Sequence, residues 1–253
     1  MTGRVVSLAR HPMKGFTSEP LDTVQLSAGA HFPGDRLYAV EDGPSGFDPD
    51  SPEHIRKMAF TVLAKLPSVA AVRTKWDEDE GSLTAWHPDF GEITCDLDGE
   101  AGRNMFAVWL SGVLAGQVGG PLKVVAAPNG YRFMDSRSGY VSVINLDSVR
   151  DLEAKTGRQI DPARFRGNIM VEGWPAWSEL DMAGRELLIG GARLGGLKPI
   201  ERCVATHVDP HSAERDMDVV SMLREHYGHF NCGLYVEVLG SGRVQPGDEA
   251  RLV

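Results

Sequence analysis

The segment Glu186-Leu187-Leu188-Ile189-Gly190-Gly191-Ala192-Arg193-Leu194-Gly195-Gly196-Leu197 shows the pattern that decides the fold. Two short apolar runs, 186–189 and 192–197, are interrupted by glycine, and each has the length of a strand. Glycine (29 residues) and proline (15 residues) punctuate the whole chain in this way. The chain is therefore predicted to be mainly β. Further strands are expected at 4–10, 22–26, 37–41, 69–75, 83–87, 92–96, 123–126, 168–171, 203–207, 234–238 and 249–253.

Several helices are expected between these strands. In 104–114 the apolar residues fall in pairs four apart, which places them on one helical face. Asn145 is predicted to cap a helix that runs through Lys155, with Gly157 placed to end it. Apolar spacing predicts two further helices, at 216–230 and 52–66.

The bulk properties narrow the class of protein. With 26 Lys and Arg against 35 Asp and Glu, the net charge is −9, which argues against nucleic acid and anionic membranes as partners. Any bound anion must therefore be held by a local pocket. No run approaches a membrane span, and the first residues lack the apolar core of a signal peptide. A cytoplasmic protein without a membrane span is expected.

Cysteine usage supports the same compartment. The three cysteines stand at 95, 203 and 232, so they cannot all pair with one another, and they form no CxxC motif. A disulfide framework or a cysteine-rich zinc site is therefore not expected, and a reducing compartment fits best.

Cys203 is the first candidate for chemistry, because Arg202 stands directly beside it. An adjacent guanidinium favours the thiolate, which attacks electrophiles and binds soft metals. The alternative is a small buried apolar residue, since free cysteines are often buried. The residues around Cys203 leave both interpretations open.

Four basic segments are candidates for anion binding. Lys14 precedes Gly15, Arg36 follows Gly34-Asp35, and Arg166 lies between Arg164 and Asn168. The fourth segment, 132–140, carries two arginines and the hydroxyls of Ser136 and Ser138. Cationic and hydroxyl side chains near glycine backbone are the groups that grip phosphate.

Other kinds of site receive less support. The chain has no GxGxxG after a strand and no GxxxxGK[ST], HExxH or GxSxG motif. Zinc is disfavoured because Cys203 and His207 are four apart on an expected strand and should not converge. A nucleophilic pair of Cys203 with His207, His226 or His229 stays open, since such pairs are spatial.

Taken in order, several of these segments resemble one known family. The segments are Pro12-Met13-Lys14-Gly15, Gly34-Asp35-Arg36, Phe165-Arg166-Gly167-Asn168, Leu187-Leu188-Ile189-Gly190-Gly191-Ala192, Arg202-Cys203-Val204-Ala205-Thr206-His207-Val208-Asp209-Pro210 and a closing Gly247-Asp248. Together they resemble the MOSC-domain proteins, named for the molybdenum cofactor sulfurase C-terminal domain, preceded by a MOSC N-terminal β-barrel domain. The resemblance implies a β-barrel-rich α+β fold with a β-barrel-like domain at 1–98 packed on a MOSC domain at 99–253.

The resemblance also implies a function. In relatives of the amidoxime-reducing type, a cysteine in the position of Cys203 ligates the metal of the molybdenum cofactor (molybdopterin). By the same resemblance the pterin and its phosphate would be held by Lys14, Arg36, Ser136, Ser138, Arg166 and Asn168. Arg202 and Thr206 would flank the metal. The expected function is a molybdenum-dependent oxidoreductase that reduces N-hydroxylated compounds or N- and S-oxides among small molecules.

Two departures from the family pattern bear on these expectations. Gly15 stands where relatives of this type commonly have serine, and Arg137 stands among the hydroxyls of Ser136 and Ser138. The chain also offers too few cysteines for an added iron–sulfur domain, so electrons are expected from a separate reductase. A sulfur carrier that uses a Cys203 persulfide is the alternative function, and a protein that stores the cofactor is a third.

Overall fold

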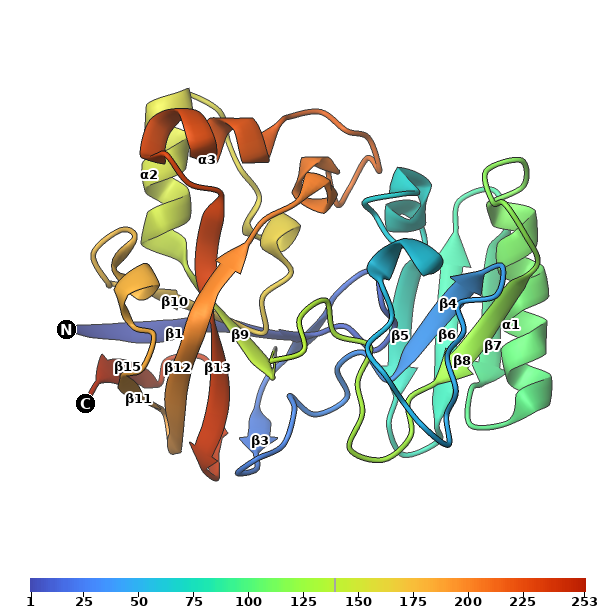
Figure 1. The fold of residues 1–253 in the computed structure, drawn as a ribbon, viewed down its shortest axis with the longest axis horizontal. Coiled ribbons are helices and arrows are strands. Elements are labelled where there is room, and N and C mark those ends of the chain that lie inside the picture. Colours follow the sequence, from blue (N-terminus) through green and yellow to red (C-terminus); the bar gives the residue numbers. More distant parts are fainter. Residues whose placement is uncertain (139) are drawn as a thin grey trace.

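A computed structural model describes residues 1–138 and 140–253, and it divides into two lobes that lie side by side (Figure 1). Gly139, which belongs to the predicted basic segment 132–140, lies outside the described residues. One lobe is a β-barrel that contains both chain ends, and the other consists of smaller sheets and one long helix. Within the described residues, no helix is long and apolar enough to cross a membrane.

The barrel is built from strands that come from both ends of the sequence. Its strand order is β10, β9, β13, β12, β11, β15, β1, and pairing of β1 with β10 closes the ring. Antiparallel pairing prevails, but β9 and β10 run parallel, joined by the crossover through α2. The strands are β1 (Thr2–Arg10), β9 (Val141–Asn145), β10 (Ile169–Glu172), β11 (Glu186–Ile189), β12 (Ala192–Glu201), β13 (Asn231–Gly240) and β15 (Glu249–Leu252).

Alternation along these strands fills the barrel. Leu187 and Ile189 of β11 are fully buried and face Leu194 and Ala192 of β12, while the intervening residues point outward. Val236 of β13 joins the same core. Gly190 adopts φ +55° at the turn, and a side chain there would meet the Asp248 carboxylate and the Arg243 carbonyl. Strands β11 and β12 therefore form a β-hairpin whose turn requires glycine.

Two helices cover one end of the barrel: α2 (Leu146–Thr156) and α3 (Val219–Tyr227). As predicted, the Asn145 side chain accepts a hydrogen bond from the Asp147 N–H, and Gly157 ends α2 in the left-handed conformation. Asp218 caps α3 in the same way through Ser221. The apolar faces of both helices form a third core cluster with Phe165 and Cys232.

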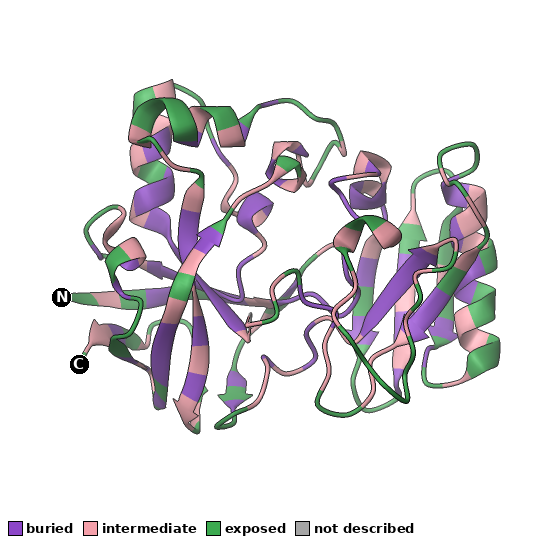
Figure 2. Cartoon of the chain, viewed as in Figure 1, coloured by how far each residue is buried: buried purple, intermediate pink, exposed green. Residues whose placement is uncertain are grey.

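The second lobe packs two sheets around α1 (Glu100–Val113). Its sheets are β4–β8 and β5–β6–β7, made of β4 (Tyr38–Asp42), β5 (Arg73–Asp77), β6 (Ser82–His87), β7 (Gly91–Asp96) and β8 (Leu122–Ala126). The inner face of α1 carries the buried side chains of Phe106, Leu110 and Val113, whereas its outer face is exposed (Figure 2). Met105, placed on the apolar face by its spacing, is instead 47% exposed.

Three short strands lie outside the barrel ring and the sheets of the second lobe. Of these, β2 (Glu19–Leu21) pairs with β1, and β3 (Val24–Leu26) pairs with β14 (Gly242–Val244). The boundary between residues 98 and 99 stays a prediction. The helix and strand that follow it, α1 and β8, share one core cluster with the strands that precede it.

Three predicted elements are wrong. Residues 203–207 form no strand; Val204–His207 is a 3-10 turn, η5, because the Thr206 hydroxyl and N–H both bond to the Cys203 carbonyl. Residues 52–66 form no α-helix but the short turn η1 (Lys57–Ala59). The strand expected at 69–75 starts at Arg73, after the 3-10 turn η2 (Pro67–Ala71). Three strands were not predicted: β2, β9 and β14.

Candidate functional site

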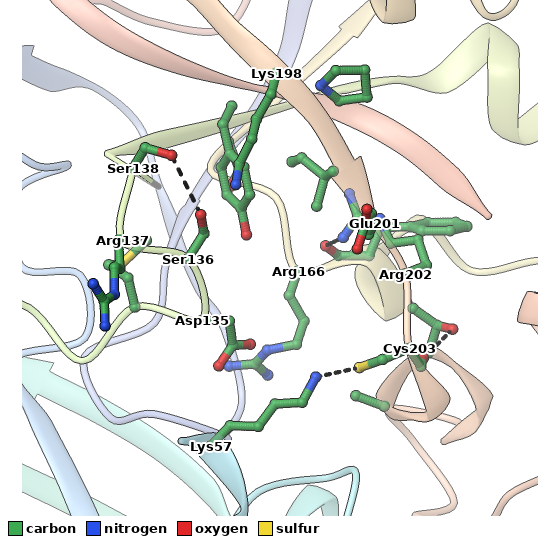
Figure 3. Close-up of a pocket in the computed structure, with 18 of the residues that line it drawn as sticks. Lys57, Asp135, Ser136, Arg137, Ser138, Arg166, Lys198, Glu201, Arg202 and Cys203 are labelled. Carbon is green, nitrogen blue, oxygen red and sulfur yellow. Dashed lines mark hydrogen bonds between the residues drawn. The ribbon is translucent and has the colours of Figure 1, made fainter. Parts of the chain in front are cut away.

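A cavity of about 550 Å³ lies where the barrel meets the second lobe. Arg36, His54 and Lys57 line it from the second lobe, and Figure 3 shows Lys57 opposite Cys203. The linker between β8 and β9 contributes Met134, Asp135, Ser136, Arg137 and Ser138. The barrel lobe supplies the rest of the wall: Ser142, Arg164, Phe165, Arg166, Lys198, Pro199, Ile200, Glu201, Arg202, Cys203, Ala205, Thr206 and Tyr235.

Cys203 enters this cavity at the point where the chain leaves β12. Its extended backbone (φ −133°, ψ 177°) precedes η5, so the thiol stands at a break in regular structure. The side chain is partly exposed, whereas the described Cys95 and Cys232 are buried. Burial raises the pKa of the Cys95 thiol and raises that of Cys232 to about 12. Of the described cysteines, Cys203 is therefore the one whose thiol reaches the cavity, and the interpretation of it as a small buried residue is wrong.

The cation in contact with this thiol is Lys57. Its Nζ lies 3.0 Å from Sγ of Cys203 (Figure 3). Burial acts to lower the pKa of Lys57, but the hydrogen bond to Cys203 and its charge raise it. The sequence analysis missed Lys57: it placed the residue in a helix expected at 52–66 and gave it no role at the site.

Arg202, the predicted cation, is turned toward the backbone instead. Its Nη1 donates to the Phe165 carbonyl at 2.7 Å, and Nε donates to the Cys232 carbonyl at 2.7 Å. The guanidinium also stacks on the Phe165 ring, 5.3 Å from its centroid. Burial lowers the pKa of Arg202. Arg202 thus joins the end of β12 to η3 (Pro162–Phe165) and to β13, and this anchors Cys203.

A buried group of cations lies beside the thiol. Lys14 is 3% exposed; its ammonium donates to the Phe133 carbonyl at 2.9 Å and pairs with Asp135. Arg36 pairs with Asp35, and Arg166 donates to the Phe16 carbonyl at 2.6 Å. A smaller cavity, lined by Lys14, Arg36, Arg166 and Cys203 among others, adjoins the first. The structure therefore brings three of the predicted basic residues together.

Two of these arginines adopt a rare backbone conformation. Arg36 and Arg166 both have φ +51°, in the left-handed region. Burial, and then the neighbouring charge of Arg36, lower the pKa of Arg166 to about 10. Burial also lowers the pKa of Lys14 despite Asp135. Lys14, Arg36 and Arg166 thus place three positive charges close together, which favours an anion beside them.

Asp135 lies at the centre of this group. Its side chain is 52% exposed, and it faces Lys14, Arg36 and Lys57. Burial acts to raise its pKa, but these three cations hold the pKa well below the usual range. Asp35 and Asp135 thus balance only part of the positive charge of Lys14, Arg36, Lys57 and Arg166.

The predicted hydroxyl and amide residues separate into two groups. Ser136 and Ser138 line the cavity with their hydroxyl oxygens 3.5 Å apart, and Thr206 lines it while closing the turn after Cys203. Asn168 does not line it. Its Oδ1 accepts from the Ser142 N–H and hydroxyl, and its Nδ2 donates to the Ala9 carbonyl. Asn168 therefore joins β1, β9 and β10 inside the barrel and orients the segment that carries Arg166.

The cavity has a predominantly cationic wall although the chain as a whole is acidic. Among the described residues its wall holds seven Lys or Arg side chains (Arg36, Lys57, Arg137, Arg164, Arg166, Lys198 and Arg202) but two carboxylates, Asp135 and Glu201. The chain, of net charge −9, thus contains a local pocket of the kind that anion binding would require.

The alternative sites weighed from the sequence find no support. His207 pairs with Asp218 at 3.0 Å, so it does not pair with Cys203, whose sulfur contacts Lys57. No group of three His, Cys, Asp or Glu side chains converges as a metal site in the described part of the chain.

Comparison with known proteins agrees with this architecture. A family model described as the MOSC N-terminal beta barrel domain matches residues 2–117, and one described as the MOSC domain matches residues 130–251. No curated protein sequence matches the chain.

Several solved structures align with the chain. The YUAD protein from Bacillus subtilis aligns over 99% of this chain and 94% of its own, with 16% identity and a TM-score of 0.47. YiiM from Geobacillus stearothermophilus (21% identity, TM-score 0.37) and YiiM from Escherichia coli (19%, 0.32) cover 47% and 46% of this chain. These alignments span 56% and 54% of the respective YiiM chains.

Proposed function

Because the chain belongs to the MOSC-domain proteins, with a MOSC N-terminal beta barrel domain before the MOSC domain, we propose that the cavity of Cys203 binds the molybdenum cofactor. The protein would act as an oxidoreductase on small N-hydroxylated compounds or N- and S-oxides. Its electrons would come from a separate reductase. The MOSC family is related to this cofactor, and the binding, the reaction and the electron donor are our proposal.

One observation carries the proposal: the partly exposed thiol of Cys203 faces a cation-lined cavity of about 550 Å³. A soft metal prefers a thiolate ligand, and a phosphorylated pterin needs cations. The volume lies within the range of small-molecule and cofactor sites. A cofactor that brings its own sulfur ligands needs a single protein thiol, so the donor set fits.

Each neighbouring residue has a part in this arrangement. Lys14, Arg36 and Arg166 would hold the phosphate, since they line the smaller cavity that Cys203 also lines. Ser136 and Ser138 would hydrogen-bond the pterin. Arg202, Thr206 and Asn168 would act as positioning residues, because their hydrogen bonds go to the backbone and side chains that hold Cys203 and Arg166 in place.

When bound, the molybdenum cofactor supplies two-electron oxygen-atom chemistry. The chain itself supplies the side chains that would bind and orient the cofactor, together with the Cys203 thiolate. Lys57, at 3.0 Å from Sγ, keeps a positive charge at the ligand position. Arg36 and Arg166 keep the inner wall positive, which favours an anionic cofactor over neutral competitors.

Metal analysis tests the proposal. Protein purified from cells that make the cofactor should contain stoichiometric molybdenum, and Cys203→Ala should lose most of it. Cys95→Ala is the matched control, because Cys95 is buried in the second lobe. Reduction of benzamidoxime by dithionite-reduced methyl viologen should follow molybdenum content. Equal metal content in wild type and Cys203→Ala, or none in either, would falsify the proposal.

A sulfur carrier is the second candidate, favoured by the contact between Lys57 and the Cys203 thiol in an open cavity. A cation beside Sγ would stabilise an anionic persulfide as well as a thiolate. Intact mass spectrometry separates the two functions. Addition of one sulfur atom, reversed by a reductant and absent from Cys203→Ala, in protein without molybdenum supports the carrier.

A further inference from the structure

A second cavity of about 500 Å³ adjoins that of Cys203. The two share His54, Met134, Ser136 and Arg137, so one segment forms the wall between them. Ser136 and Arg137 lie on the side of the first cavity away from Cys203 (Figure 3). The remaining lining residues of this second cavity, which we call the outer cavity, are His31, Glu53, Gly130, Tyr131, Arg132 and Tyr140.

Arg132 is the unusual group of the outer cavity. Its Nη1 donates to the Tyr131 carbonyl at 2.6 Å, but its Nε is buried and has no hydrogen-bond partner among the residues that the structure describes. Within the described residues no carboxylate forms an ion pair with it. A half-buried guanidinium that lacks an ion-pair partner carries a desolvation cost, and an anion in the cavity would offset this cost through the terminal nitrogens, because Nε itself is enclosed. Arg137 adds a second positive charge at the shared wall.

Aromatic side chains complete this cavity. Tyr140 stacks on His31 with ring centroids 4.7 Å apart and an interplanar angle of 26°. Tyr131 lies edge-on to Phe133, and its hydroxyl donates a hydrogen bond to the Glu53 carbonyl. These two contacts restrict the position of the Tyr131 ring. Rigid aromatic faces beside cations select a flat apolar group attached to a negative charge.

We propose that the outer cavity binds an aromatic carboxylate or a similar aryl anion, with the anion at Arg132 and the ring against Tyr140 and Tyr131. Glu53, exposed at the rim, disfavours anions there and so directs the charge toward Arg132. Because the outer cavity shares a wall with that of Cys203, the aryl group would be the recognition end of the substrate. That last step rests on the proposed function; the binding itself does not.

Benzoate is the probe, and the test uses the full chain without molybdenum. Ligand-observed NMR should show saturable binding, and benzoate should raise the unfolding midpoint. Arg132→Met should weaken binding about tenfold and Tyr140→Leu about fivefold, the sizes expected for a charge-assisted contact and an aromatic contact. Cyclohexanecarboxylate and benzyl alcohol should each bind more weakly than benzoate, since each lacks one recognition element.

Arg185→Met is the matched control, because Arg185 is exposed and lies outside both cavities. It should bind benzoate as the wild type does. Arg132→Met removes a cation that forms no ion pair among the described residues and should fold normally, which a denaturant unfolding curve checks. Unchanged affinity in Arg132→Met, or no saturable benzoate binding by the wild type, overturns the proposal.

The two proposals fail separately. Cys203→Ala should lose molybdenum and still bind benzoate, because Cys203 does not line the outer cavity. If benzoate binding instead disappears in Arg166→Met and persists in Arg132→Met, the ligand occupies the cavity of Cys203, and the outer cavity is not its site. That result would leave the molybdenum measurement untouched.

Discussion

Lys57 and Cys203 stand 146 positions apart in the sequence, and their Nζ and Sγ atoms are 3.0 Å apart in the folded chain. One residue comes from the second lobe and the other from the end of a barrel strand. The contact therefore exists only when the lobes are packed together. It makes the electrostatics of the thiol a property of the interface between them.

Removing Lys57 should change how Cys203 selects charged reagents. Lys57→Met takes one positive charge from beside Sγ, so alkylation by anionic iodoacetate should slow more than alkylation by neutral iodoacetamide. The ratio of the two rates should fall about fivefold, corresponding to roughly 1 kcal/mol of electrostatic attraction. Intact mass spectrometry of timed samples measures both rates. Arg185→Met should keep the wild-type ratio, and an unchanged ratio in Lys57→Met contradicts the contact.

Arg164 should contribute strongly to stability. Its guanidinium is buried and binds Asp209 and Asp216 at 2.8 Å each, together with the carbonyls of Thr206 and His207. Arg164 thus stabilises the segment from Thr206 to Asp216, which follows Cys203. Arg164→Met should lower the free energy of unfolding by about 3 kcal/mol, because two carboxylates lose their cation.

Urea unfolding measures the effect of Arg164→Met. Arg150→Met is the control, since the Arg150 side chain is 53% exposed and also binds two carboxylates, Asp147 and Glu172. Exposed pairs of this kind contribute less than about 1 kcal/mol. Equal destabilisation by both substitutions would show that burial of Arg164 is not what matters.

His11 should make the protein less stable in acid. Burial, and then the charges of Arg166 and Arg36, lower the pKa of His11 to about 3, against 6.5 in an unfolded chain. Between these values the unfolded state binds more protons, so stability is full above pH 6.5 and falls as the pH drops toward 3.

Unfolding curves at several pH values test the role of His11. In this window the free energy of unfolding of the wild type should depend more steeply on pH than that of His11→Asn, by up to about 1.4 kcal/mol per pH unit. The other titrating groups, Asp35 included, remain in both proteins. Parallel pH curves for the two proteins would be evidence against a neutral buried His11.

Gly233 should be required for the placement of Arg202. It has φ +87°, and a Cβ there would lie 2.7 Å from the Val143 carbonyl oxygen and 3.0 Å from Nη2 of Arg202. Gly233→Ala should destabilise the protein by more than about 2 kcal/mol, because backbone strain and a clash combine. Gly247→Ala is the matched control: φ is +92°, but nothing lies within 4 Å. Its cost should be nearer 1 kcal/mol, and chemical denaturation compares the two.

Local signals in the sequence were sufficient for most of the regular structure. Glycine-interrupted apolar runs located the strands of the 186–197 hairpin, and Asn145 and Gly157 marked the ends of α2. Side-chain alternation and helix capping depend on residues that are close in sequence, so the sequence alone can predict them. The family pattern then indicated a barrel, and it singled out Cys203, Lys14, Arg36 and Arg166 as neighbours.

Tertiary structure decided the rest, for physical reasons that concern distant partners. Residues 203–207 have the β-branched composition of a strand, but two hydrogen bonds from Thr206 to the Cys203 carbonyl turn the chain there. Arg202 is adjacent to Cys203 in sequence, but its donors satisfy the buried carbonyls of Phe165 and Cys232, which only packing supplies. The sequence by itself determined which thiol is the reactive candidate and that a barrel holds it. Packing of the two lobes decided that Lys57 is its cation and that the outer cavity adjoins it, since charges and walls so far apart in the chain meet only in the folded protein.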